Sequence, residues 1–257
     1  MPSAPRIIRS LTEFRRLCHT LAPGDVVLGP MAVKPGEEIK LLDALERGVK
    51  FFPSVLAQML SRSKTAQAEV LGEFMVPGTF VAYGPADLAA QLPAYHGKGQ
   101  VVTKRDRAHL GLGVSLWPSL EVLCSLAGLQ GLPYPLVVQP LLPEGRDLRV
   151  LAVGDYWEAY ERRNPYNFRQ NLFQGGISWP AQLSDDLQAF CQQVMSRGKF
   201  PYALLDLLIS PGGEFYLLEI NLKGGLKGSR LGQAAFRERV RLLTDKWASE
   251  PLSQPPI

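Results

Sequence analysis

The sequence predicts an α+β protein made of three lobes, two of which face each other across a cleft near Pro135. The chain has 257 residues, of which 46% are hydrophobic and 20% charged, a balance typical of a globular protein with an ample core. Helical and strand patterns mix in the first half, and strands dominate from Leu136 onward. We expect the lobes to span residues 1–60, 61–134 and 135–257.

The first lobe has the pattern of an incomplete α/β unit. A short strand is predicted over 25–29, helical periodicity runs from Glu37 to Arg47 and ends at Gly48, and a further short helix begins at Ser54. The Gly-x-Gly-x-x-Gly fingerprint of dinucleotide-binding domains does not occur. We therefore expect this lobe to be structural support or a wall of the substrate site.

The other two lobes are predicted as runs of helices and strands. In the second lobe we expect helices at 63–75, 85–92 and 119–127, and strands at 79–83 and 101–104. In the third we expect strands at 136–140, 148–153 and 157–161, a helix at 185–197 capped by Ser184, a hairpin of 202–209 and 214–221, and a final helix at 231–247.

Composition and pattern argue against several classes of protein. No run of about 18 apolar residues occurs and Met1 to Ser10 lack the apolar core of a secretory signal, so we expect a cytoplasmic protein with no membrane span. Three dispersed cysteines match neither a zinc-ligand pattern nor a disulfide framework. A net charge of +4 is too small to indicate nucleic acid as a partner.

Three polar residues stand in the two apolar strands of the last hairpin. Glu219 and Asn221 are two apart and so share one sheet face, and the hairpin can bring Asp206 alongside them. Two carboxylates and an amide oxygen are suitable ligands for a Mg²⁺ ion that also binds phosphate oxygens. The alternatives are a solvated sheet face or pairing of the two acids with nearby lysines and arginines.

Two further segments suggest phosphate chemistry. Lys104 ends a strand and is followed by Gly111 and Gly113, so a lysine and a glycine loop could both contact phosphates, although such a loop is more often a simple turn. The polar run 161–171, which contains Arg169 and Asn171, fits an exposed loop. It also offers the donors that a charged phosphoryl-transfer transition state requires.

Taken in order, these segments resemble the ATP-grasp superfamily, and most closely its RimK-like branch of glutamate ligases. The resemblance runs from about Gly48 to Ser229, and the stretch from Val137 to Gly228 carries most of it. There the chain reads Val-Gln, Glu-Gly-Arg-Asp-Leu-Arg, Val-Gly-Asp, Glu-Arg-Arg, Phe-Arg-Gln-Asn-Leu, Gly-Gly, an inward Asp and Glu-Ile-Asn. The implied fold has two α/β lobes that clasp a nucleotide cleft, preceded by a truncated N-terminal α/β lobe.

The resemblance implies ATP and Mg²⁺ as cofactors, with Mn²⁺ as an alternative metal, and a role for each matching residue. The implied ATP-binding residues are Lys64, Lys104, Gly111, Gly113, Gln139, Leu141, Asp147 and Arg169. The implied catalytic residues are Lys104, Arg169 and Asn171. The implied substrate residues are Arg149, Arg162 and Lys223, and the implied metal ligands are Asp206, Glu219 and Asn221.

The implied reaction is ATP-dependent ligation of a carboxylate to an amine, an amino acid or a peptide-like substrate, through an acylphosphate. The resemblance names neither substrate and leaves a homo-oligomer open. A small-molecule kinase on the same fold and a non-catalytic nucleotide-binding or scaffold protein are the alternative functions. They would be separated by whether ADP release needs an amine and whether hydroxylamine traps an acylphosphate.

Three features depart from the family's usual pattern. Pro140 stands where the family usually has Glu, which removes an N–H and a carboxylate from the adenine edge. The phosphate loop has Ala108 and His109 in place of a glycine and small polar residues. Lys223 adds a positive charge near the metal end, where an acidic substrate would benefit from it.

Overall fold

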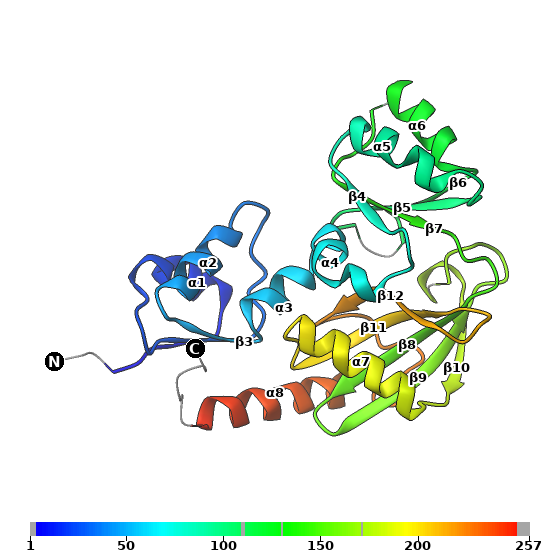
Figure 1. Cartoon of the computed structure of the whole chain (residues 1–257). Coiled ribbons are helices and arrows are strands. Elements are labelled where there is room, and N and C mark those ends of the chain that lie inside the picture. The colour runs from blue at the N-terminus through cyan, green and yellow to red at the C-terminus, as the bar shows by residue number, and fades with distance from the viewer. Residues whose placement is uncertain (1–3, 109–110, 130, 171, 251–257) are drawn as a thin grey trace.

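The structure is a computed structural model that describes residues 4–108, 111–129, 131–170 and 172–250. Figure 1 shows three lobes. The N-terminal lobe is a parallel sheet in the order β1 (Ile7–Ile8), β2 (Val26–Leu28), β3 (Lys50–Phe52), accompanied by α1 (Leu11–Leu17), the short 3₁₀ helix η1 (Cys18–Thr20) and α2 (Glu38–Glu46). Two helices, α3 (Val55–Leu60) and α4 (Lys64–Leu71), lead from it to the other lobes, and α4 continues into η2 (Gly72–Phe74).

The small lobe is a four-stranded antiparallel sheet with helices on one face. Its strand order is β4 (Phe80–Ala82), β7 (Leu136–Pro140), β5 (Val101–Arg105), β6 (Val114–Trp117). The helices are α5 (Pro85–Tyr95) and α6 (Leu120–Leu129). Leu88 and Leu123 from these helices pack against Val101 and Val138 of the sheet, and all four are fully or almost fully buried.

The large lobe is a five-stranded antiparallel sheet. Its order is β10 (Ile177–Ala181), β9 (Tyr156–Arg163), β8 (Arg146–Val153), β11 (Tyr202–Ile209), β12 (Phe215–Asn221), with η3 (Leu172–Gln174) before β10 and α7 (Asp185–Arg197) on one face. Ser184 caps α7 through its side chain, which accepts a hydrogen bond from the Leu187 N–H at 3.3 Å. The other sheet face looks toward the small lobe (Figure 1).

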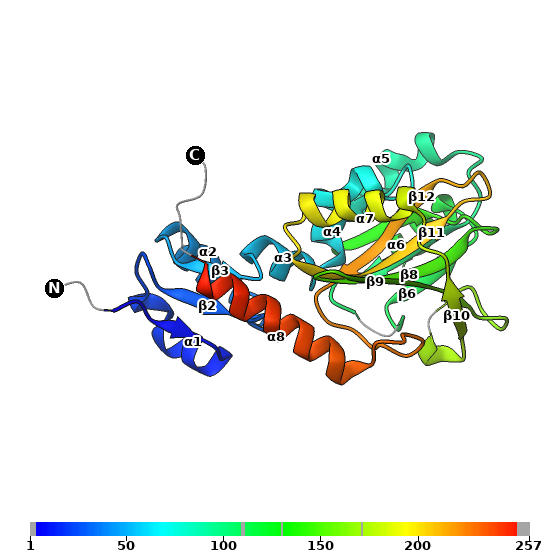
Figure 2. The same cartoon turned by 90° about the horizontal axis from the view of Figure 1, so that it is seen from below.

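Helix α8 (Gln233–Ser249) ties the large lobe to the N-terminal lobe. Figure 2 shows it running along both. Trp247 near its end packs on Phe52 of β3 with ring centroids 5.4 Å apart. Val26, Leu28 and Phe52 therefore belong to the same buried cluster as the core of the large sheet. The N-terminal lobe is held against the large lobe by apolar packing and not only by its chain connection.

The predicted elements are confirmed with small shifts at their ends. Helix α7 and strands β7 and β11 have the predicted bounds, and the other predicted helices and strands differ by a few residues. Helix α1 and four short strands, β1, β3, β6 and β10, were not predicted, and β6 lies where a loop was expected. The expected lobe boundaries after residues 60 and 134 stay predictions, because buried clusters report packing and not independent folding units. None of the helices in the described part of the chain is long and apolar enough to cross a membrane.

Candidate active site

A cavity of about 940 Å³ lies where the three lobes meet. Strands β5, β6 and β7 of the small lobe form one side, the open face of the large sheet forms the other, and the loop 30–35 of the N-terminal lobe closes one end. This volume is at the upper end of the range for small-molecule sites. Thirteen of the predicted site residues line it: Lys64, Lys104, Gly111, Gln139, Leu141, Asp147, Arg149, Arg162, Arg169, Asp206, Glu219, Asn221 and Lys223.

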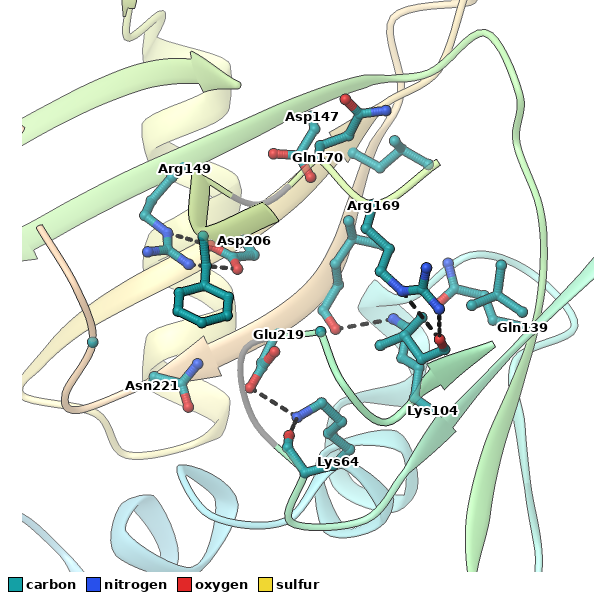
Figure 3. A pocket seen from close by; sticks show the side chains of 18 of the residues that line it. Lys64, Lys104, Gln139, Asp147, Arg149, Arg169, Gln170, Asp206, Glu219 and Asn221 are labelled. Carbon is teal, nitrogen blue, oxygen red and sulfur yellow. Dashed lines mark hydrogen bonds and ion pairs between the residues drawn. The ribbon is translucent and has the colours of Figure 1, made fainter. Parts of the chain in front are cut away.

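The three predicted oxygen ligands share the cavity face of the β11–β12 hairpin (Figure 3). Asp206 lies opposite Glu219, and Asn221 is two residues further along β12, opposite Leu204. The register shifts directly after Asp206, so Leu218 has no partner residue on β11. Such a bulge re-aims nearby groups and is common beside active sites.

The bulge gives Lys104 its position. The ammonium of Lys104 crosses the cavity from β5 and donates to the Leu218 carbonyl at 3.2 Å. Burial lowers the pKa of Lys104 to about 8, although the nearby Glu219 carboxylate raises it and the Lys64 ammonium lowers it further. The cavity therefore holds a lysine whose charged form is costly until an anion is bound beside it.

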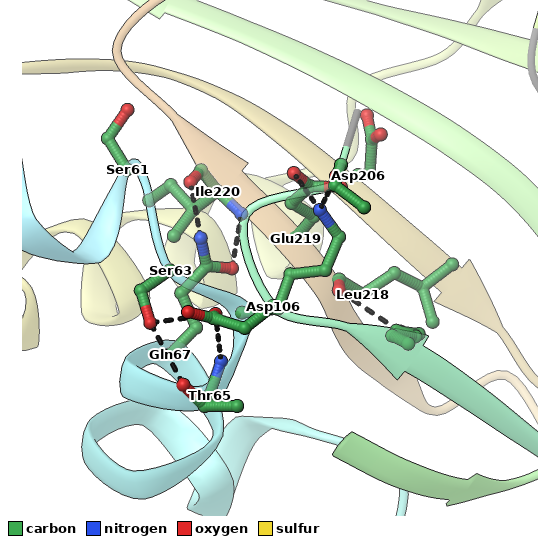
Figure 4. A network of polar contacts seen from close by, with 12 residues as sticks. Ser61, Ser63, Thr65, Gln67, Asp106, Asp206, Leu218, Glu219 and Ile220 are labelled. Carbon is green, nitrogen blue, oxygen red and sulfur yellow. Dashed lines mark hydrogen bonds and ion pairs between the residues drawn. The ribbon is translucent and has the colours of Figure 1, made fainter. Parts of the chain in front are cut away.

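Lys64, at the first turn of α4, lies beside Glu219. Its Nζ atom is 3.2 Å from Glu219 Oε1 and donates to the Ala108 carbonyl of the phosphate loop at 2.7 Å. Gln67, one turn along α4, bonds both backbone groups of Ile220 at 2.9 and 3.0 Å, as Figure 4 shows. Because Gln67 is almost fully buried, these bonds hold α4 and Lys64 firmly at the edge of β12.

Asp206 belongs to a group of alternating charges on the sheet face. Arg149 donates to both of its carboxylate oxygens at 2.5 and 2.7 Å, and Arg162 lies 3.3 Å away. Arg162 also donates to Asp147 at 2.6 Å. Burial alone would raise the pKa of Asp206, but the two guanidinium groups hold it well below its usual range. Asp147 is more deeply buried, and burial raises its pKa against the opposing effect of Arg162.

These contacts bear on the metal prediction. Both acids are paired with basic side chains, which is one of the alternatives weighed for them. Asp206 accepts two hydrogen bonds from Arg149 and a longer one from Arg162, and Glu219 has a single contact to Lys64. Among the described residues no group of three or more His, Cys, Asp and Glu side chains could hold a metal. The set on the sheet face is two carboxylates and an amide, which fits a hard cation in its donor chemistry. The metal role of the three residues stays a proposal.

Strand β7 with Leu141 and Leu142 after it, which we call the hinge, tolerates Pro140 without loss of sheet bonding. Leu141 N–H donates to the Gln100 carbonyl at 2.9 Å, and bonded and non-bonded pairs alternate along an antiparallel ladder. Pro140, opposite Val101, therefore lies in a pair that needs no N–H from it. The N–H of Leu141 is used within the sheet. Among the described residues, the N–H of Leu142 has no protein partner, and the buried Oε1 of Gln139 has none either.

Arg169 extends from the loop after β9 to the small lobe. Its Nε and Nη2 atoms both donate to the Val114 carbonyl at the start of β6, and its guanidinium stacks on Phe168 with 4.4 Å to the ring centroid. Of the three predicted catalytic residues, Lys104 and Arg169 are described, whereas Asn171 lies outside the described residues, as does His109. Arg169 lies on the same side of the cavity as Lys104 (Figure 3).

The phosphate loop between β5 and β6 is fixed by residues that the sequence did not single out. Asp106 accepts from Ser63 Oγ and Thr65 N–H at 2.9 and 3.1 Å, at the start of α4 (Figure 4). Arg107 donates to Glu38 of α2 at 2.5 Å. The charged run 105–107 directly after a predicted strand was the available signal. Gly111 lines the cavity, whereas Gly113 does not; a Cβ there would lie 2.2 Å from that of Ala108.

The arrangement of two sheets closing on one charged cavity defines the class of protein: this is an ATP-grasp fold. Residues 56–235 match the family model of the RimK-like ATP-grasp domain, and the chain belongs to that family. It is 32% identical over 158 residues to a probable alpha-L-glutamate ligase of Klebsiella pneumoniae (strain 342), an alignment that covers 60% of this chain and 52% of that protein.

Two further similarities support the fold. N-acetylaspartylglutamate synthase A of Mus musculus is 27% identical over 203 residues, 76% of this chain and 53% of the relative. A structure of the ATP-grasp ligase PsnB with its minimal precursor, Mg and ADP superposes with a TM-score of 0.58 at 17% identity, covering 87% of this chain and 79% of that one. The chain spans about half the length of the two relatives matched by sequence.

Proposed function

We propose that this protein is a Mg·ATP-dependent ligase that activates a carboxylate as an acylphosphate and joins it to an amine. The proposal depends mainly on one observation. Lys64, Lys104 and Arg169 line the same cavity as the face of β11 and β12 that carries the three predicted oxygen ligands. Phosphoryl transfer depends mainly on positioning and on neutralising charge, and these groups supply both. The relatives named as ligases and a synthase support the same reaction class.

The adenine would lie between the apolar side chains of Val102, Leu116 and Leu208, which line the cavity next to β7. The two groups without a protein partner at the hinge are complementary to it. Gln139 Oε1 would accept from the exocyclic amine and Leu142 N–H would donate to a ring nitrogen. Guanine has a carbonyl oxygen where adenine has its exocyclic amine, and that oxygen would face Gln139 Oε1, which is also an acceptor. We therefore expect ATP to be preferred over GTP.

Lys64 and Lys104 would contact the phosphates, and Glu219 and Asn221 would hold Mg²⁺, with Asp206 kept in place beside them by its arginines. The metal would neutralise charge on the phosphates, and Mn²⁺ could replace it. The donors of Arg149 and Arg162 are directed at Asp206 and Asp147. These two arginines would therefore position the carboxylates on the cavity face of the large sheet. Arg169 is the side chain that would contact the phosphate group being transferred.

In the first step a carboxylate oxygen of the acid attacks the γ-phosphorus, the bond to the bridging oxygen breaks, and ADP leaves. In the second step the amine nitrogen attacks the acyl carbon, phosphate departs, and the amine loses a proton. Lys104 and Arg169 would meet the charge that develops on the phosphoryl group. No covalent bond to the protein is required.

The test is ADP release from a panel of acids, each with and without hydroxylamine. Hydroxamate formation that depends on the acid and on Mg²⁺ supports an acylphosphate. ADP and a stable phosphorylated product, with no hydroxamate and no need for an amine, would identify a kinase. The absence of ADP with every acid, together with nucleotide binding, would indicate a non-catalytic nucleotide-binding protein.

A further inference from the structure

The phosphate loop between β5 and β6 is held at three successive residues. The carboxylate of Asp106 accepts hydrogen bonds from two groups at the start of α4 (Figure 4), and the Ala108 carbonyl accepts one from Lys64 of the same helix. Arg107, which lies between them, donates instead to Glu38 of α2, in the N-terminal lobe. The loop therefore depends on two different parts of the chain for its position.

The backbone of Arg107 has an uncommon conformation. Its φ angle is 55°, in the region that favours glycine and that residues with a side chain seldom occupy. Such a conformation persists only where the surrounding contacts hold it in place. The bonds at Asp106 and Ala108 hold the chain on either side, and the ion pair with Glu38 holds the side chain itself. We therefore expect the loop to relax when the pair is lost.

The ion pair of Arg107 and Glu38 is short and only partly exposed to water. The Nη2 and Oε1 atoms are 2.5 Å apart, and the two side chains are 34% and 18% exposed. Both residues line a small cavity of about 90 Å³ between α2, α3 and the start of α4. Burial would raise the pKa of the Glu38 carboxyl, but its own backbone N–H and the Arg107 guanidinium lower it, so the group is charged at neutral pH. The pair is therefore screened less than a fully exposed one.

Helix α2 gives this contact a firm base. Leu41, on its inner face, packs in the core of the N-terminal lobe and is 2% exposed. Glu37, the residue before Glu38, accepts two hydrogen bonds from Arg15 of α1 at 2.5 and 3.0 Å. The Gly36 N–H donates to the second carboxylate oxygen of Glu38 at 2.6 Å, which orients that group. The position of Glu38 is therefore set by contacts within the N-terminal lobe.

We infer that Glu38 and Arg107 are positioning residues through which the N-terminal lobe fixes the loop that contacts the phosphates of ATP. The inference rests on the proposed function for the identity of the nucleotide. Arg107 lines the main cavity, but its guanidinium is directed at Glu38, so neither residue acts on the reacting atoms. The N-terminal lobe, which the sequence indicated only as support or as a wall of the substrate site, thereby takes part in nucleotide binding.

A substitution at Glu38 separates positioning from a simple effect of charge. Glu38→Gln removes a negative charge near the cavity, and by electrostatics alone this strengthens the binding of an anionic nucleotide. Loss of the ion pair frees the loop and weakens that binding. The two explanations therefore predict changes of opposite sign. Glu37→Gln is the matched control, because it removes the same charge from the neighbouring residue and breaks ion pairs that lie within the N-terminal lobe.

The test measures binding of the imido analogue of ATP with Mg²⁺ by calorimetry, and of AMP by competition with that analogue. We expect Glu38→Gln to weaken binding of the analogue by about three- to tenfold and to leave AMP unchanged, because AMP lacks the β- and γ-phosphates. Glu37→Gln should bind the analogue as wild-type protein does or slightly more tightly. The double variant of Glu38→Gln and Arg107→Gln should bind it like Arg107→Gln alone, because the two residues act through one contact. In the hydroxamate assay, Glu38→Gln should raise KM for ATP and change kcat little.

Unchanged or tighter binding of the analogue by Glu38→Gln would overturn the inference, and so would an equal loss in Glu37→Gln, an equal loss for AMP, or additive losses in the double variant. If Glu38→Gln does not fold, Arg107→Gln is compared with Arg107→Lys, which keeps the charge and a donor. Arg107→Lys should then retain most of the affinity, and equal losses in both would overturn the inference.

Failure of the inference can be told apart from failure of the proposed function. If wild-type protein and Glu38→Gln bind the analogue equally, nucleotide binding stands and the positioning role falls. If wild-type protein binds no nucleotide, the proposed function falls, and hydrogen exchange of the ligand-free protein decides the role of the pair. The amides of Arg105 and Val114, which bond to carbonyls of the loop at 2.8 and 3.3 Å, should exchange faster in Glu38→Gln than in Glu37→Gln. Equal exchange in the two variants would overturn the inference.

Discussion

Lys104 offers a direct test of how the cavity uses charge, because its ammonium is held in a place that favours the neutral form. Burial lowers its pKa from 10.5 to about 8, which corresponds to roughly 3 kcal/mol of free energy against the charged folded state at pH 7. The bond to the Leu218 carbonyl returns about 1 kcal/mol. Replacing Lys104 by methionine should remove both effects.

We therefore predict that Lys104→Met stabilises the ligand-free protein by about 2 kcal/mol at pH 7, which is roughly 4–8 °C in melting temperature. The same variant should lose most of the thermal shift caused by Mg·ATP, because a phosphate contact is gone. Urea unfolding and thermal scans with and without Mg·ATP measure the two effects. Lys34→Met, at an exposed lysine of the N-terminal lobe, is the control for adding a methionine.

The sign of the pH dependence follows from the lowered pKa. The folded protein releases the Lys104 proton near pH 8 and the unfolded chain near about 10.4. The cost of the charge is therefore fully present below about pH 8 and relieved as pH rises toward 10.4. The advantage of Lys104→Met should shrink over that window. A variant that is less stable than wild type at pH 7, or an advantage that does not change with pH, would refute the reasoning.

Four further predictions concern single side chains. Arg149→Leu leaves the largely buried carboxylate of Asp206 with one arginine and should cost about 3 kcal/mol in urea unfolding, with Arg149→Lys recovering only part. A loss below about 1 kcal/mol would contradict this. Asp25, whose burial alone would raise its pKa, has a pKa of about 2 because of hydrogen bonds from Arg6 and two backbone N–H groups. Its stabilising contribution is present above about pH 4 and lost as pH falls toward 2, so acid unfolding of Arg6→Leu should be less steep in that range, and an unchanged slope would contradict the assignment. Gln139→Leu should weaken ATP binding by roughly 5–10-fold and raise the stability of the ligand-free protein, whereas unchanged binding would remove Gln139 from the base site. Arg169→Ala should lower the rate by about 100-fold or more with only a small change in nucleotide affinity; equal losses in both would make it a binding residue.

Much of the large lobe could be predicted from the sequence because its patterns are strong. The apolar strands 202–209 and 214–221 gave the hairpin, and the two-residue period placed Glu219 and Asn221 on one face. That face does line the cavity. The helix after Ser184 had both caps in the sequence. Strands β1, β3, β6 and β10 are short or follow irregular loops, and strands of two to five residues leave little periodicity to detect.

The contacts within the site could not be predicted in the same way. The sequence indicated acids and arginines, but not that Arg149 would engage Asp206 with two bonds or that Arg162 would join Asp147 and Asp206. These pairings depend on the register of β8 against β9 and β11. The bulge at Leu218, which accepts from Lys104, and the capping of α4 by Asp106 likewise depend on tertiary geometry.

Binding of Mg·ATP through Glu219 can be measured by thermal-unfolding scans with ATP and Mg²⁺, each alone and together, on wild-type protein and on Glu219→Gln. A ligand at about 100 times its dissociation constant adds roughly 2.7 kcal/mol, or about 5–10 °C for a chain of this size. We predict a shift of that order in wild type that needs both ATP and Mg²⁺ and is largely lost in Glu219→Gln. No shift at millimolar nucleotide, or an equal shift without Mg²⁺, would contradict it.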